Sequence, residues 1–64
     1  MPDISTKELN YVKDFLSWEL YMAKICQQYS EQVTDQGFGR ILDKAGQVHQ
    51  QNYDEMFSYL EQVK

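Results

Sequence analysis

Two titratable side chains lie within otherwise apolar helical stripes of this 64-residue sequence. Glu19 stands in DFLSWELYMAK, among Phe, Leu, Trp and Met residues, and His49 is the single histidine of the chain. A carboxylate and an imidazole can bind zinc or iron, and they can also form a hydrogen-bonded pair. The chemistry open to this chain therefore depends on whether Glu19 and His49 meet.

The elements that must position these two residues are separated by one plausible break, the segment TDQGFG at 34–39. Glycine favours a turn there, and the chain has no linker or low-complexity tract elsewhere. Ser5 and Glu8 have the spacing of a capping box at a helix start. Asp35 is the expected N-cap of a second helix.

Apolar residues recur at helical spacing on both sides of this break, and strand-like alternation is absent. The first stripe comprises Leu9, Val12, Leu16, Glu19, Ala23, Cys26, Ser30 and Val33. The second is predicted to comprise Leu42, Ala45, His49, Met56, Tyr59 and Val63, with Tyr53 and Leu60 beside it. We therefore predict an all-α fold, a hairpin of two antiparallel helices, because a short turn makes consecutive helices neighbours. The prediction is one domain, 1–64, with a helix at about 5–33, a turn at 34–37 and a helix at about 38–63.

In such a hairpin Glu19 and His49 face the same core at similar height. Counted from the turn, they lie about 17 residues back and about 13 residues forward, so their levels differ by about 6 Å. The interpretation we favour is a buried polar pair that fixes register, with Tyr53 or Tyr29 as other partners for Glu19. The alternative is a metal site, to which two copies each bring Glu19 and His49 around a divalent metal such as zinc or iron. No catalytic residue is predicted.

The apolar arc of the first helix is wider than one partner helix can cover. A lone hairpin would leave Trp18, Tyr11, Ile25 or Phe57 in water, and exposed apolar area of this kind usually marks an interface. We therefore expect a homodimer, in which two hairpins form a four-helix bundle. An adaptor that docks a helix of a different protein would use the same face.

Composition and charge exclude several classes of partner. The net charge is −4 and the six Lys and Arg residues are scattered, so neither a nucleic acid nor a membrane surface is an expected partner. No apolar run reaches the roughly 18–20 residues that a membrane span needs. The N-terminal residues lack a basic-then-apolar leader, so a cytoplasmic location is expected. The single cysteine, Cys26, rules out a disulfide within the chain and is expected to be a buried, inert thiol.

The stretch TDQGFGRILDKAGQVHQQNYDEMFSYL resembles the second helix of the spore coat protein F family, small ferritin-like proteins of spore-forming bacteria. The matching residues are Asp35, Arg40, His49 and Leu60, in an acid-led turn and a helix with a central histidine. The resemblance covers most of the chain and implies a half-ferritin hairpin in a spore coat. It also implies other coat or sporulation proteins as partners, and no known reaction.

Ferritin-like proteins bind two metals through a glutamate on one helix and Glu-x-x-His on the next. By this resemblance Glu19 stands for the first glutamate and His49 for the histidine, but Gly46 replaces the bridging glutamate. That departure removes a carboxylate from each hairpin, and Gly46 is instead expected to allow close packing. We predict a non-enzymatic structural or interaction module, with a metal-binding ferritin-like protein as the alternative.

Overall fold

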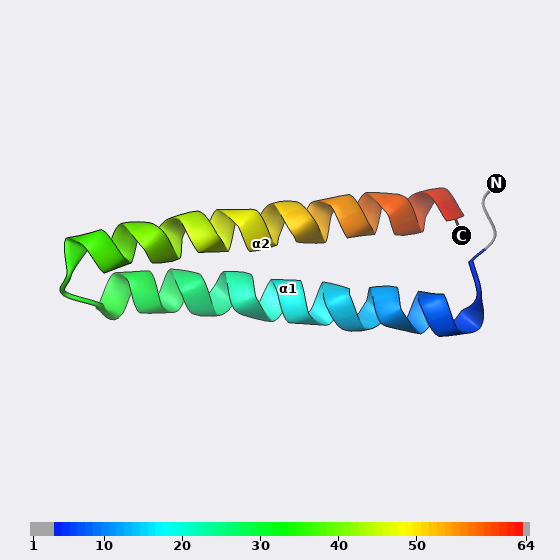
Figure 1. The fold of residues 1–64 in the computed structure, drawn as a ribbon, viewed down its shortest axis with the longest axis horizontal. Helices are drawn as coiled ribbons and strands as arrows, with labels where there is room; N and C mark the ends of the chain where they lie inside the picture. Colours follow the sequence, from blue (N-terminus) through cyan, green and yellow to red (C-terminus); the bar gives the residue numbers. More distant parts are fainter. Residues whose placement is uncertain (1–3, 64) are drawn as a thin grey trace.

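The computed structural model describes residues 4–63, which form two helices packed side by side. Helix α1 spans Thr6–Gln32 and helix α2 spans Gln36–Val63, and the chain reverses direction between them (Figure 1). The predicted all-helical hairpin is confirmed, and the described residues contain no strand. The predicted domain range also includes residues 1–3 and 64, which lie outside the described residues.

The hairpin is one layer of structure. Its principal extents are 47 × 16 × 11 Å, and the smallest of these is close to the diameter of a single helix, about 10–12 Å. Neither α1 nor α2, over the residues described, is apolar enough along its length to cross a bilayer.

Both helix starts are capped as predicted. The hydroxyl of Ser5 accepts the backbone N–H of Glu8 at 3.1 Å, and the Glu8 carboxylate accepts the backbone N–H of Ser5 at 3.4 Å. At the other start, Asp35 Oδ1 accepts the backbone N–H of Phe38 at 2.8 Å. Because Asp35 caps α2 directly, that helix begins at Gln36, as the predicted N-cap requires and two residues before the approximate bound of 38.

The helices meet along a seam whose positions alternate in steps of three and four residues. In α1 the seam consists of Leu9, Val12, Leu16, Glu19, Ala23, Cys26, Ser30 and the capping residue Val33, all half-buried or buried. In α2 it consists of Gly39, Leu42, Gly46, His49, Tyr53, Met56, Leu60 and Val63, all half-buried. This alternation is that of an antiparallel coiled coil. The prediction that Tyr59 belongs to the core stripe was wrong, because its side chain is 40% exposed.

Two glycines let the helices approach closely. A Cβ added to Gly46 would lie 3.2 Å from the Cβ of Cys26, and one added to Gly39 would lie 3.6 Å from Cγ2 of Val33. The close-packing role predicted for Gly46 is therefore confirmed. These two contacts also fix the register of α1 against α2, since Cys26 lies opposite Gly46 and Val33 lies opposite Gly39.

Candidate functional site

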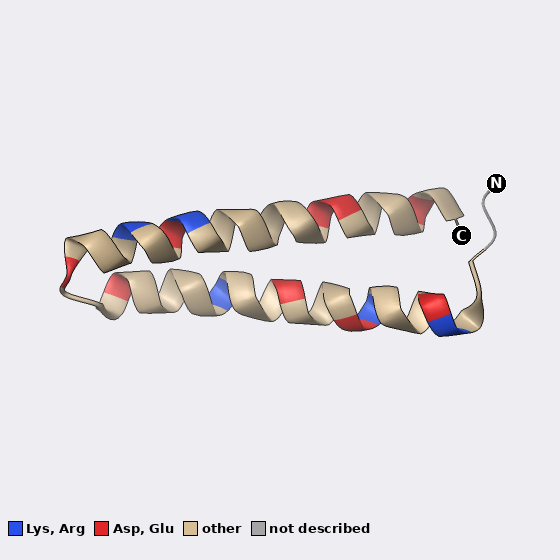
Figure 2. Cartoon of the chain, viewed as in Figure 1, with Lys and Arg blue, Asp and Glu red and all other residues tan. Residues whose placement is uncertain are grey.

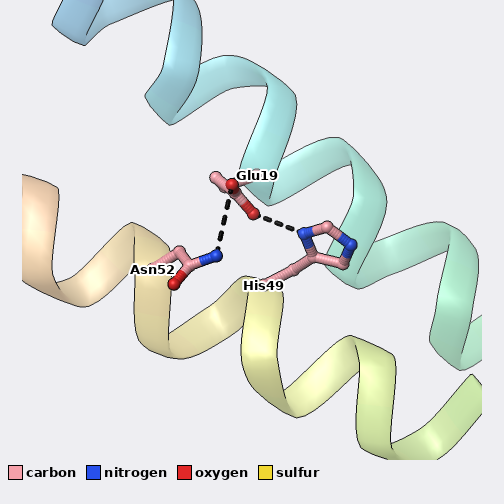
Figure 3. Close-up of polar contacts among 3 residues, drawn as sticks. All are labelled: Glu19, His49 and Asn52. Carbon is pink, nitrogen blue, oxygen red and sulfur yellow. Dashed lines mark hydrogen bonds and ion pairs between the residues drawn. The ribbon is translucent and has the colours of Figure 1, made fainter.

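Glu19, His49 and Asn52 form a polar cluster at the middle of the seam (Figure 3). The Glu19 carboxylate projects from α1 and contacts Nδ1 of His49 through Oε2. Asn52 lies three residues after His49, on the same side of α2, and its amide donates to Glu19 Oε1 at 3.4 Å. Both carboxylate oxygens therefore have a partner on the opposite helix.

The meeting of Glu19 and His49 agrees with the sequence prediction, whereas Asn52 was missed. Asn52 stands in a glutamine-rich stretch, QVHQQN, whose composition is typical of a solvated face. Its spacing of three residues from His49 was the available signal, because side chains at that spacing lie side by side on a helix. Tyr29 and Tyr53, the other predicted partners, make no hydrogen bond to Glu19 within residues 4–63.

The cluster is unequally buried. The Glu19 side chain is 8% exposed and that of His49 is 24% exposed. A carboxylate withdrawn from water needs hydrogen-bond donors in its place, and His49 and Asn52 supply them. When Glu19 is ionised, Nδ1 of His49 carries the proton that it donates. The seam thus holds a satisfied polar pair that links one specific level of α1 to one specific level of α2.

One hairpin does not provide a metal site. Zinc sites use at least three protein ligands, and no group of three or more His, Cys, Asp or Glu side chains comes together within the described part of the chain. Glu19 and His49 face each other through Oε2 and Nδ1, and Gly46 contributes no ligand one turn before His49. Cys26 is buried, as predicted, so its thiol is not open to a substrate.

A second candidate site is a broad exposed surface, which we name the apolar face. In α1 it consists of Tyr11, Phe15, Trp18, Met22, Ile25 and Tyr29, the residues that precede successive seam positions. In α2 the residues that precede seam positions include Phe38, Ile41, Ala45, Val48 and Tyr59. The predicted exposure of Trp18, Tyr11 and Phe57 is confirmed at 52%, 50% and 43%, whereas Ile25 is half-buried, as is Met22.

The helical geometry places both halves of this face on one side of the hairpin. A residue that precedes a seam position is rotated by about 100° from it around the helix axis. Because α1 and α2 run in opposite directions, the same rotation has opposite senses when both helices are viewed from one end. Both sets of side chains therefore lie on the same side of the hairpin. The sequence prediction had recognised the contribution of α1, but Phe57, the α2 residue that it named, follows a seam position and lies on the opposite side.

The opposite side of the hairpin is polar. Residues that follow seam positions on both helices, among them Lys24, Gln27, Asp43, Gln47 and Gln50, line one groove of about 460 Å³. Because residues that follow seam positions in α1 and in α2 line the same groove, both sets lie on one side of the hairpin. This supports placing the residues that precede seam positions on the other side. Leu20 and Phe57 are the large apolar residues on this side, and Phe57 stacks on Tyr53 at 6.0 Å.

Charged residues of both signs occur on the two helices. Lys and Arg are interspersed with Asp and Glu along α1 and in the turn-proximal half of α2, whereas the charged residues in the other half of α2 are acidic over the described range (Figure 2). Within the described range, the residues that precede seam positions include only two charged ones, Glu8 at the start of α1 and Glu55 in α2. The apolar face is therefore almost free of charge over its length.

Comparisons with known proteins identify a relative. No family model matches the chain, and no solved structure matches it significantly. The sequence is 33% identical over 58 residues to the protein described as Uncharacterized protein YuzM of Bacillus subtilis (strain 168). That alignment covers 91% of this chain and 72% of YuzM. The chain therefore belongs to the same family as YuzM.

Proposed function

We propose that this protein is a non-enzymatic assembly module that forms a homodimer by stacking the apolar faces of two hairpins into a four-helix bundle. The observation that carries the proposal is the apolar face itself, an uninterrupted α1 stripe with exposed side chains such as Phe15 and Trp18. Stable domains are built from two packed layers around a core, and a single hairpin supplies one layer.

Burial energetics favour a second copy. Among the described residues only Glu19 and Cys26 are buried in one hairpin. Fully burying one large apolar side chain contributes roughly 1.5–3 kcal/mol, and chains of about 60 residues are marginal without added support. A symmetric partner removes several exposed aromatic side chains from water at once and brings few charges together.

The proposed setting is a spore coat or the cytoplasm of a cell that builds one, with other coat or sporulation proteins as further partners. The resemblance to the spore coat protein F family supports this setting. Two of the residues that carry the resemblance have structural roles here: Asp35 caps α2 and His49 pairs with Glu19.

The dimer is tested by the mass in solution of the native chain and two matched variants. Phe15→Glu places a charge on the apolar face, whereas Leu20→Glu places the same charge on the polar side of α1. We expect sedimentation equilibrium to give twice the 7.6 kDa of one chain for the native protein and for Leu20→Glu. Phe15→Glu is expected to sediment as a monomer. A native chain that stays monomeric and folded would overturn the proposal.

A second candidate function, metal binding across the dimer, is favoured by one further observation. The seam of each helix has two columns of side chains, and one column lies nearer to the apolar face than the other. Glu19 in α1 and His49 in α2 both belong to the nearer column. Stacking two apolar faces would bring the two clusters toward each other in the bundle interior. Two Glu19 and two His49 side chains make a four-ligand set of the kind that holds zinc.

Elemental analysis separates the two candidates. The protein is purified without chelator, beside Glu19→Gln and His49→Gln, which keep polar groups at both positions. If the dimer is a metal protein, the native chain carries zinc or iron in a fixed ratio to the dimer and both variants lose it. A metal-free native dimer leaves the assembly module without this second function.

A further inference from the structure

The apolar face also indicates how two copies are oriented. Resting on the dimer proposed above, we infer that the hairpins stack with their turns at opposite ends. In this arrangement α1 packs antiparallel against α1 of the second copy, and α2 packs against α2.

Two-fold symmetry leaves two ways to stack one flat face on a copy of itself. When the two-fold axis runs along the helices, the turns lie at the same end and α1 packs against α2 of the second copy. When the axis runs across the helices, the turns lie at opposite ends and each helix packs against its own copy. Every neighbouring pair of helices is antiparallel in both cases, so the choice depends on which side chains meet.

The α1 stripe is complementary to its own reverse. Its six residues, Tyr11, Phe15, Trp18, Met22, Ile25 and Tyr29, follow steps of four, three, four, three and four residues. Read backwards the steps are unchanged, so two antiparallel copies of α1 meet at every position. Trp18 then lies opposite Met22, Phe15 opposite Ile25, and Tyr11 opposite Tyr29. These contacts form a continuous apolar seam with coiled-coil spacing.

The α2 stripe is not uniform, and this decides between the two arrangements. Its half near the turn is apolar, from Phe38 to Val48, but Asn52, Glu55 and Gln62 follow. The register fixed by Gly46 and Gly39 places Glu55 level with residues 15–18 of α1.

With the turns at the same end, Glu55 would therefore press against Trp18 and Phe15 of the second copy. A carboxylate desolvated without a donor is costly. With the turns at opposite ends, Glu55 instead lies level with residue 49 of α2 in the second copy, between Val48 and Asn52. It then meets one aliphatic and one amide side chain rather than two aromatic rings.

Asn52, whose amide already donates to Glu19, gains a second partner in the opposite-end arrangement. The two-fold axis then passes the hairpin at the level of residue 20 in α1, which is also the level of Asn52 in α2. The two Asn52 side chains meet at the axis, and amides can donate to and accept from each other. A single polar pair of this kind at a helix contact specifies register and orientation.

Spin labels on the turn distinguish the arrangements. Thr34 lies in the turn and is exposed, so Thr34→Cys accepts a thiol-reactive nitroxide, whereas Cys26 is 4% exposed. In the opposite-end dimer each turn is about 14 residues from the axis, so double electron–electron resonance should give a label separation of roughly 40 Å. In the same-end dimer the labels would be separated by about two helix diameters, roughly 20 Å.

Ser17→Cys is the matched control. It is exposed on the polar side near the middle of α1, so its two labels lie across the bundle in either arrangement. A long turn separation, beside a Ser17→Cys signal and a dimeric mass, supports the inference. A short turn separation in a confirmed dimer overturns the orientation and leaves the dimer intact. A monomeric mass with no dipolar signal at either position overturns both. If Cys26 also reacts with the label, the separations are measured again with Thr34→Cys and Ser17→Cys in a Cys26→Ala background.

Discussion

At the scale of single residues, the fold depends on how one carboxylate is kept in a nearly dry seam. Glu19 is buried because both of its oxygens have partners on α2, from His49 and Asn52. Such a pair adds little net stability, since two polar groups must be desolvated before they bond. Its effect is specificity: α1 and α2 cannot slide past each other without separating Glu19 from its donors.

This account predicts an asymmetric result when the pair is dismantled. His49→Leu removes the main partner of a carboxylate that stays buried, so we expect a loss of about 3–5 kcal/mol in the free energy of unfolding. Glu19→Leu should cost less, because His49 is partly exposed and can bond to water. The double variant should be more stable than His49→Leu alone. Urea unfolding at one fixed protein concentration measures all three, and losses that simply add would contradict the pairing.

At the scale of the helices, the predictable features were those carried by side-chain type and spacing. Ser5, Glu8 and Asp35 identified both helix starts because capping is local chemistry. The α1 seam was predicted correctly, since an apolar side chain occupies most of its positions. The α2 seam was predicted in part, because Gly39 and Gly46 occupy seam positions without a side chain to reveal them. The residues placed correctly were Leu42, His49, Met56 and Val63. Asn52 and the α2 half of the apolar face depend on tertiary register, which a single helix does not encode.

The two seam glycines predict opposite responses to the same substitution. Alanine favours a helix interior over glycine by about 1 kcal/mol, so Gly39→Ala, whose new Cβ meets ordinary contacts at 3.6 Å, should stabilise the hairpin. At Gly46 the new Cβ would lie 3.2 Å from the Cβ of Cys26, which cannot move without its backbone. Gly46→Ala should therefore destabilise despite the gain in helix propensity. Thermal unfolding followed by circular dichroism compares them, and equal stabilisation by both would show that Gly46 is not a close-packing site.

At the scale of the whole molecule, the hairpin has two unlike sides and too little thickness to enclose a core. The polar side carries the mixed charges and the groove at Gly46, and the other side carries the apolar stripe of α1 with the turn-proximal half of α2. In a structure whose smallest extent is 11 Å, each helix packs against one neighbour, and the rest of its surface is open to water. Its stability is therefore expected to come largely from what covers the apolar face, which ties folding to association.

Coupled folding and association predict that thermal stability depends on protein concentration. When a dimer unfolds to two separate chains, dilution favours the chains, and each tenfold dilution lowers the apparent free energy of unfolding by about 1.4 kcal/mol of dimer. The native protein and Leu20→Glu should both show Tm falling steadily over a hundredfold dilution. Phe15→Glu, which disrupts the apolar face, should have a low Tm that does not change with concentration. Circular dichroism melts across the dilution series measure this, and a native Tm that stays constant would mean that one hairpin is stable alone and that its apolar face tolerates water.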